Sequence, residues 1–149
     1  MKKLKLLLLC PIFTLLQISC SKDKNEITYP TNEDIILENI SYGPHDRNKM
    51  DIMLPSERNT TKTKILVLIH GGGWIGGDKS DFDVILNRDN LENLKKEFPE
   101  IAVFSFNYRL ATSEANQYPS AEQDVKAAMD FIFKNANSYQ VNSNATYTL

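Results

Sequence analysis

Two unbroken apolar runs stand out in the pattern of hydrophobic and polar positions. Residues 65–69 are all aliphatic, and residues 101–106 are apolar except for one serine. Runs of this length are typical of strands that are buried on both faces of a parallel sheet. Between them, apolar positions predict helical segments that end at Pro99: Phe82, Ile85, Leu86, Leu91, Leu94 and Phe98. A strand, a helix and a strand in this order predict a right-handed parallel crossover.

The residues before these runs predict an antiparallel hairpin. Residues 35–42 and 49–54 are rich in β-formers, and the segment 43–48 between them, Gly-Pro-His-Asp-Arg-Asn, is dense in turn residues. The second strand alternates, which predicts one covered face: Met50, Ile52 and Leu54 against Asp51 and Met53. The polar residues 55–64 that follow predict a surface loop.

A second helix is predicted after Pro119. Its apolar residues recur on one face: Ala121, Val125, Ala128, Met129, Ile132 and Ala136. Ser120 is the predicted N-cap, and Gln123 would complete a capping box with it. Residues 145–149 predict the start of a further strand. Residues 35–149 therefore predict an α/β domain, an antiparallel hairpin leading into a parallel sheet with flanking helices.

These elements make up about half of a doubly wound sheet, in which later strands and a second helical layer follow. We therefore expect the sequence to be truncated. We also expect a large apolar face of its sheet to be left uncovered.

The first twenty residues predict an export signal. Three lysines lie within residues 1–5, and the apolar run 6–18 is too short to span a membrane. The segment resembles a bacterial lipoprotein signal, since Ser19 precedes Cys20 and polar residues follow. Cys20 is then expected to be lipidated after cleavage, which would anchor the protein to a membrane in the periplasm or at the cell surface.

The alternative is an ordinary signal cleaved near Ser19, which gives a secreted protein, and the mass of the mature N-terminus separates the two. Residues 1–20 are the signal in either case, and residues 21–34, rich in charged and polar side chains, are expected to form a flexible tether.

Composition and charge exclude several classes of partner and of chemistry. The chain of 149 residues has six glycines and six prolines, as in a single globular domain. Without the three lysines of residues 1–5, 14 basic residues remain against 19 acidic ones, which argues against nucleic acid as a partner. Both cysteines, Cys10 and Cys20, precede the predicted domain, so it has no thiol for catalysis or a metal. We expect no metal and no cofactor.

A glycine-rich motif, His70-Gly71-Gly72-Gly73-Trp74, follows the first buried strand, and five of the six glycines lie within residues 71–77. Residues without Cβ let the backbone turn sharply and bring its N–H groups to a ligand oxygen, which suits an oxyanion. A phosphate-binding loop is an alternative, although the lysine and hydroxyl residue of a Walker motif are not at the positions that the motif requires. A tight turn without a catalytic role is the second alternative.

Taken in order, the motifs resemble the N-terminal half of an α/β-hydrolase. They are similar to its esterase branch, which includes hormone-sensitive-lipase-like carboxylesterases and bacterial feruloyl and acetylxylan esterases. The resemblance covers about residues 37–149 and rests on five segments: Met50–Pro55, His70–Trp74, Asn107–Leu110, Tyr118–Pro119 and Asp124–Ala128.

The resemblance implies a role for each residue of the motif. The N–H groups of Gly72 and Gly73 would form part of an oxyanion hole. Gly71 would permit the turn, and His70 would support the loop rather than act as a base. Trp74 would either line the acyl or alcohol pocket or pack against the loop.

The resemblance also concerns four residues outside the motif. Arg109 and Asp124 would form an internal ion pair between the end of a strand and a helix, which is a structural role. Tyr108 and Tyr118 would either line a pocket or pack as aromatic residues, and packing is the expectation.

The catalytic serine of this family lies in Gly-x-Ser-x-Gly, which the sequence does not contain, and the only histidine besides that of the motif is His45 in the hairpin turn. We therefore expect the intact parent to be a serine carboxylic-ester hydrolase that acts through an acyl-enzyme on small-molecule or polysaccharide esters. This chain is expected to be inactive alone. The alternatives are a non-catalytic exported lipoprotein that binds a ligand, and a peptidase of the same fold class.

Overall fold

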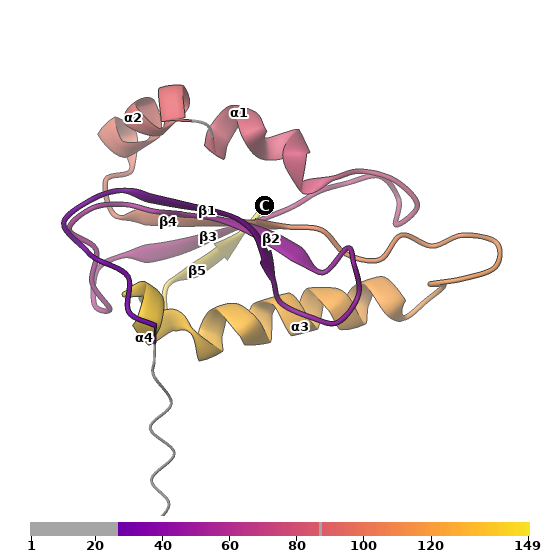
Figure 1. Ribbon diagram of the computed structural model, residues 1–149. Coiled ribbons are helices and arrows are strands. Elements are labelled where there is room, and N and C mark those ends of the chain that lie inside the picture. Colours follow the sequence, from indigo (N-terminus) through magenta and orange to yellow (C-terminus); the bar gives the residue numbers. More distant parts are fainter. Residues whose placement is uncertain (1–26, 87) are drawn as a thin grey trace, which may run out of the picture.

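The computed structural model describes residues 27–86 and 88–149 and contains a five-stranded mixed sheet (Figure 1). The strands are β1 (Ile35–Ser41), β2 (Lys49–Leu54), β3 (Lys64–Ile69), β4 (Ile101–Phe106) and β5 (Thr146–Thr148). Their order across the sheet is β1-β2-β4-β3-β5.

The strand directions match the predicted hairpin and parallel sheet. β2 is antiparallel to both of its neighbours, β1 and β4, whereas β3 is parallel to β4 and to β5. Lys64 lies opposite Ile101 and Ile69 lies opposite Phe106. The carboxyl ends of β3 and β4 therefore meet at one edge of the sheet, and the segments that follow them begin side by side.

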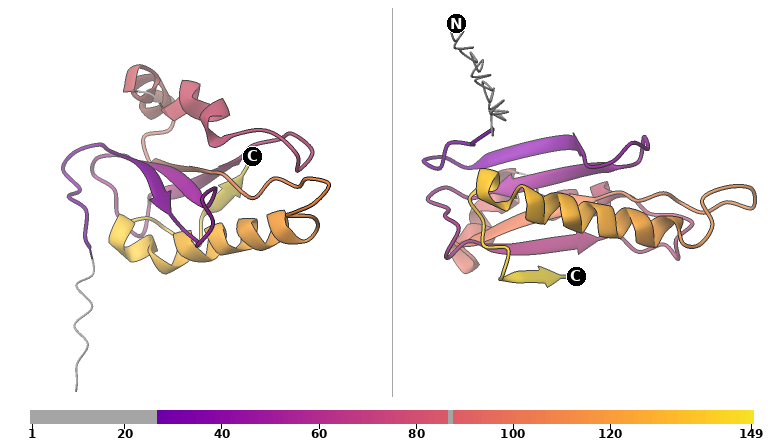
Figure 2. Two further views of the ribbon diagram at one scale, coloured as in Figure 1. Left: turned by 45° about the vertical axis from the view of Figure 1, so that its right-hand side comes forward. Right: turned by 90° about the horizontal axis from the view of Figure 1, so that it is seen from below.

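Helices cover both faces of the sheet (Figures 1 and 2). The helices on one face are η1 (Lys79–Phe82, a 3-10 helix), α1 (Asp83–Leu86) and α2 (Arg88–Glu97). Those on the other are α3 (Ser120–Lys134) and α4 (Ala136–Tyr139). The expectation of a large uncovered face is therefore not met, because the segment between β3 and β4 supplies its own helical layer. Exposed apolar side chains do remain at β5, on Tyr147 and Leu149.

Successive side chains of a strand point to opposite faces of the sheet, so they pack in different hydrophobic cores. In β4, Phe104 packs in the larger core, to which α3 contributes Ile132. Its neighbour Val103 packs on the other side with Leu68 and Met53. The two apolar runs are thus buried on both faces, as their composition predicted.

The alternation in β2 does not mark an exposed face. Met53 is fully buried and Asp51 is only 7% exposed, because the helical layer between β3 and β4 covers this face: Phe82, Ile85 and Leu94 pack against the cluster that holds Met53. The Asp51 carboxylate accepts hydrogen bonds from Lys79 Nζ at 2.6 Å and from the Asn39 amide at 2.7 Å. A buried carboxylate needs such partners, and these lie too far away in the sequence for the pattern to reveal them.

The predicted capping box at Ser120 is wrong. Pro119 occupies the N-cap of α3, no side chain caps the helix, and Ser120 is its first residue. A capping box is found instead at η1, where Asp78 accepts from the Ser80 amide at 3.1 Å and Asp81 accepts from the Asp78 amide at 3.2 Å. Aspartate is as good an N-cap as serine, and an acidic side chain can close the box as glutamate does.

The segment 55–64 is not all surface loop, because it holds Arg58, only 3% exposed. The Arg58 guanidinium donates to the backbone carbonyls of Pro30, Glu33, Pro55 and Tyr139. The ring of Tyr29 stacks on that of Tyr139 with centroids 5.5 Å apart. Residues 29–34, which we expected within the tether, therefore lie against the domain.

Replacing Arg58 with methionine should lower the free energy of unfolding by about 3 kcal/mol, since several part-buried carbonyls lose their charged donor. It should also speed amide hydrogen exchange in residues 29–34. The matched control is Lys62→Met in the same segment, where the half-exposed contact to Glu100 is 3.9 Å long and little change is expected. Equal losses in the two variants would contradict this role of Arg58.

Candidate active site

The two sequence motifs meet at the carboxyl edge of the sheet, where segment 70–78 follows β3 and segment 107–111 follows β4 (Figure 1). The Tyr108 hydroxyl donates to the His70 carbonyl at 2.9 Å, and the Ala111 amide donates to the Trp74 carbonyl at 2.8 Å. Parallel pairing of β3 with β4 brings the motifs together, although about 35 residues separate them in the sequence.

The glycine-rich segment turns through residues with positive φ. These are Gly72 at +104°, Gly73 at +60° and Trp74 at +68°, followed by Gly77 at +93°. A Cβ on Gly72 would lie 2.2 Å from the Gly76 carbonyl oxygen, whereas a Cβ on Gly71 would meet nothing within 4 Å. The turn therefore requires glycine at Gly72 rather than at Gly71, which the resemblance had made responsible for it.

Three consecutive backbone donors are left unpaired in this turn. Within residues 27–86 and 88–149, the amides of Gly72, Gly73 and Trp74 donate no hydrogen bond. The carbonyl of Gly72 is paired, because it accepts from the amides of Ile75 and Gly76 at 3.1 Å each. All three donor residues are exposed. Consecutive N–H groups in such a turn form a concave site that suits an anion.

His70 lies beneath this turn and is only 3% exposed. Its ring stacks on the Tyr108 ring with centroids 4.2 Å apart, and its Nδ1 lies 2.8 Å from the Gly71 carbonyl oxygen. A carbonyl only accepts, so this contact assigns the proton to Nδ1. Nε2 is buried and has no partner among the residues that the structure describes. His70 is therefore packed between the Tyr108 ring and the backbone of the turn.

The aromatic residues near the turn differ in exposure. Tyr108 is buried, and burial raises the pKa of its hydroxyl. The ring of Trp74 is tilted against that of Tyr108 at a centroid distance of 5.3 Å, yet Trp74 remains 47% exposed. One part of its indole therefore packs and another part is open to a ligand. Tyr118 is 85% exposed, so the expectation that it packs is wrong; it precedes the N-cap of α3 in a segment that projects from the domain.

Arg109 and Asp124 form the expected ion pair between the end of β4 and α3. Nη2 and Nε of Arg109 lie 2.8 and 3.0 Å from Oδ1 of Asp124, and the Arg109 amide donates to Oδ2 at 2.9 Å. Burial disfavours the charged form of Asp124, but the hydrogen bonds from Arg109 outweigh it and hold the pKa of the carboxyl below its ordinary value. The same contact raises the pKa of Arg109.

Three residues of this edge were not assigned a role from the sequence. Arg47 in the hairpin turn donates from Nε to the Tyr108 carbonyl at 2.8 Å and from Nη2 to the Gly77 carbonyl at 3.0 Å. Asn107 donates to Asp78 Oδ2 at 2.7 Å, and Arg47 Nη1 lies 3.4 Å from the same oxygen. Asn107 belongs to the quoted Asn-Tyr-Arg-Leu motif, but the partners of Arg47 lie 30 and 61 residues away, and no local pattern marks them.

The carboxyls of Asp78 and Asp124 predict a loss of stability in acid. Burial opposes their ionisation, but hydrogen bonds, from the Ser80 amide and Asn107 to Asp78 and from Arg109 to Asp124, hold both pKa values below the ordinary 3.8. The unfolded chain therefore binds protons at a higher pH than the folded one. The stabilisation is complete above pH 3.8 and declines as the pH falls through the lowered pKa values. Urea midpoints between pH 7 and pH 2 should show this decline, and a weaker one in Asp124→Asn; equal slopes would contradict it.

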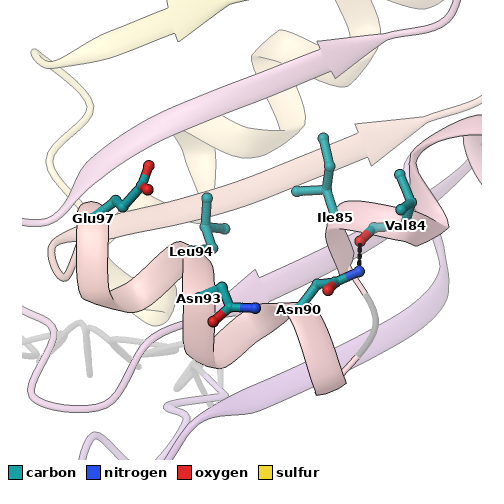
Figure 3. Close-up of a pocket in the computed structure, with 6 residues that line it drawn as sticks. All are labelled: Val84, Ile85, Asn90, Asn93, Leu94 and Glu97. Carbon is teal, nitrogen blue, oxygen red and sulfur yellow. Dashed lines mark hydrogen bonds between the residues drawn. The ribbon is translucent and has the colours of Figure 1, made fainter.

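A surface hollow of about 350 Å³ lies between α1 and α2 (Figure 3). The Asn90 amide donates to the Val84 carbonyl at its rim. Its lining comes from these two helices alone: Val84, Ile85, Asn90, Asn93, Leu94 and Glu97. None of the motif residues contributes to it, so we do not assign the candidate site there.

The part of the chain that the structure describes has no serine hydroxyl hydrogen-bonded to His45 or His70. It also has no group of three His, Cys, Asp or Glu side chains that could hold a metal ion. No helix in residues 27–86 and 88–149 is long and apolar enough to cross a membrane. Cys20, the expected lipidation site, lies outside the described residues.

Comparisons with known proteins agree with this architecture. Residues 50–149 match the BD-FAE family model. Probable carboxylesterase 16 of Arabidopsis thaliana is 30% identical over 82 residues, or 55% of this chain, and probable carboxylesterase 11 of the same plant is 31% identical over 84 residues, or 56%. The chain spans 17% of the length of each plant relative.

Solved structures of esterases share the fold. A bifunctional GH43-CE protein of Bacteroides eggerthii aligns with a TM-score of 0.59 and 28% identity, over 76% of this chain and 14% of that one. Esterase B of Lactobacillus rhamnosis aligns with a TM-score of 0.59 and 19% identity, over 81% of this chain and 36% of that one. The fold is that of the α/β-hydrolases, and because the family model covers most of the sequence, the chain belongs to the BD-FAE family.

Proposed function

We propose that the protein is a carboxylic-ester hydrolase in which the glycine-rich turn supplies the oxyanion hole. The observation that carries the proposal is the row of unpaired, exposed N–H groups of Gly72, Gly73 and Trp74 at the carboxyl edge of the sheet. The membership in the BD-FAE family and the carboxylesterase relatives support it.

The proposed chemistry follows from where negative charge develops during ester cleavage. When a serine hydroxyl attacks the ester carbonyl, the carbonyl oxygen becomes negative, and the amides of Gly72 and Gly73 would donate to that oxygen. Collapse of the tetrahedral intermediate breaks the ester C–O bond and expels the alcohol, which takes the proton that the base removed from the serine. Water then hydrolyses the acyl-enzyme to the carboxylic acid and the free serine. Removing one such donor typically costs about 100- to 1000-fold in kcat. The serine, its base and its acid have no matching positions within the 149 residues, so we assign them to the parent protein.

The half-open indole of Trp74 supports a substrate with an apolar or ring-shaped group beside the ester. Its packed part is fixed by Tyr108, and its carbonyl is held by the Ala111 amide at 2.8 Å, so the exposed part is a preformed wall. Both small-molecule esters and acylated carbohydrates offer such groups.

The coding DNA beyond Leu149 tests the proposal first. A Gly-x-Ser-x-Gly segment, followed later by an acidic residue and a histidine, is the expected result, and the longer product should then hydrolyse p-nitrophenyl acetate. An error-checked stop codon at this point would remove the serine-hydrolase proposal. The chain of 149 residues serves as the control and should release p-nitrophenol no faster than buffer.

A further inference from the structure

The glycine-rich turn has two arms, a first arm of residues 70–72 and a second arm of residues 76–78. We propose that Arg47 is a positioning residue of the oxyanion hole, because its guanidinium holds the second arm. The inference rests on the proposed function of this turn, and it concerns a side chain of the β1–β2 hairpin that the motifs do not include. Through Arg47, the hairpin turn at residues 43–48 helps to position the candidate site.

One guanidinium group joins three acceptors from two segments. Nε donates to the Tyr108 carbonyl at 2.8 Å and Nη2 donates to the Gly77 carbonyl at 3.0 Å, while Nη1 lies 3.4 Å from Asp78 Oδ2. Arg47 is the only hydrogen-bond donor to the Gly77 carbonyl within the described ranges. The planar fork of arginine can make these contacts at the same time, which the single ammonium of lysine cannot do.

The hairpin turn fixes the backbone from which Arg47 reaches out. The Arg47 amide donates to His45 Nδ1 at 3.1 Å, and its carbonyl accepts from the Lys49 amide at 2.7 Å. The Asn48 amide donates to the His45 carbonyl at 2.8 Å, and Asn48 Oδ1 accepts from the His45 amide at 2.9 Å. The backbone of Arg47 is therefore held in place by the turn, independently of the contacts that its guanidinium makes.

The arm that Arg47 holds is in direct contact with the donors. A Cβ on Gly77 would lie 2.4 Å from the Gly71 carbonyl oxygen, and a Cβ on Gly72 would lie 2.2 Å from the Gly76 carbonyl oxygen. The Gly76 amide also donates to the Gly72 carbonyl at 3.1 Å. Because the two arms touch backbone to backbone, a shift of Gly77 displaces Gly72 and the amides that follow it.

The other anchors act elsewhere on the turn. Tyr108 holds the first arm through the carbonyls of His70 and Gly71, at 2.9 and 3.3 Å, and the Ala111 amide holds Trp74. Asn107 holds the Asp78 side chain, and its Oδ1 accepts from the Lys79 amide at 2.7 Å, two residues after Gly77. Loss of Arg47 thus leaves these anchors in place and removes the hydrogen bond that holds the Gly77 carbonyl. An oxyanion hole depends on donors held in place before the reaction, so a small displacement has a large effect.

The test uses the 149-residue chain, labelled with ¹⁵N and titrated with sodium acetate, whose carboxylate oxygen stands in for the oxyanion. The readouts are the amide resonances of Gly72, Gly73 and Trp74 and the fluorescence of Trp74, the only tryptophan of the chain. Arg47→Ala is expected to weaken acetate binding about tenfold and to leave the amide resonances of the β-sheet unchanged. Methylguanidinium should restore binding in this variant and have no effect on the wild type.

Lys49→Ala is the matched control, because it removes one positive charge beside the hairpin turn, and among the described residues its ammonium contacts only Ser41 Oγ. It should bind acetate as the wild type does. If Arg47→Ala fails to fold, Arg47→Lys keeps the charge and should show the same weakening. Wild-type affinity in either Arg47 variant would overturn the inference and leave the oxyanion hole standing. Absence of any acetate response in the wild type would instead count against the oxyanion hole itself.

Discussion

Replacing Gly72 with alanine is expected to lower the free energy of unfolding by about 3 kcal/mol and to abolish the response of the neighbouring amides to acetate. The Gly72 φ of +104° is unfavourable for any residue with a Cβ. The new methyl carbon would also lie 2.2 Å from the Gly76 carbonyl oxygen, which is backbone and cannot rotate away. The turn must open to admit it, so the donors lose their arrangement.

Gly71→Ala provides the control one position earlier in the chain. Gly71 is exposed, and a Cβ there meets nothing within 4 Å. Its urea midpoint should lie close to that of the wild type, with unfolding followed by far-UV circular dichroism in both variants. If Gly71→Ala and Gly72→Ala are equally stable, the turn is not packed as the structure has it.

Replacing Asp124 with alanine should cost about 3 kcal/mol of stability, because it leaves Arg109 without its partner. The carboxylate of Asp124 is buried at the inner face of α3 and accepts from both the backbone and the side chain of Arg109. The pair joins β4 to α3, so its loss should also loosen the segment after β4. Urea denaturation of the variant measures the loss, and hydrogen exchange at Arg109 locates it.

Asp130→Ala is the matched control on the same helix. Asp130 pairs with Lys126 one turn away, but both side chains are exposed. Such a pair contributes at most about 0.5 kcal/mol. A loss at Asp130 as large as that at Asp124 would contradict the role of the buried pair, because alanine itself favours the helix more than aspartate does.

The sequence predicts most of the elements because their signals are local. The two apolar runs are long enough to mark strands buried on both faces, and the helix after Pro119 repeats its apolar residues every three or four positions. The burial of Asp51 and Arg58 cannot be predicted from such local signals. Each is a charged residue that the fold buries, and each is stabilised by partners that only the tertiary structure brings near.

Part of the candidate site can likewise be predicted from the sequence, and part of it cannot. The motif locates the donor turn, since three glycines in a row after a buried strand leave few other interpretations. It does not tell which glycine the turn needs, because that depends on the contact between Gly72 and Gly76. The exposure of Tyr118 and the reach of Arg47 depend on how separate segments meet, and neither is encoded in a short pattern.

The stacking of Tyr29 on Tyr139 determines how the molecule can be handled. Tyr139 lies in α4, whereas the glycine-rich turn lies at the opposite end of the parallel strands (Figure 1). A bead, a sensor chip or a fusion partner attached ahead of residue 27 therefore joins the domain at the end remote from Gly72. Immobilisation through this end should leave the donor turn accessible to bulky ligands in solution, while the same attachment through the hairpin turn at residues 43–48 would obstruct it.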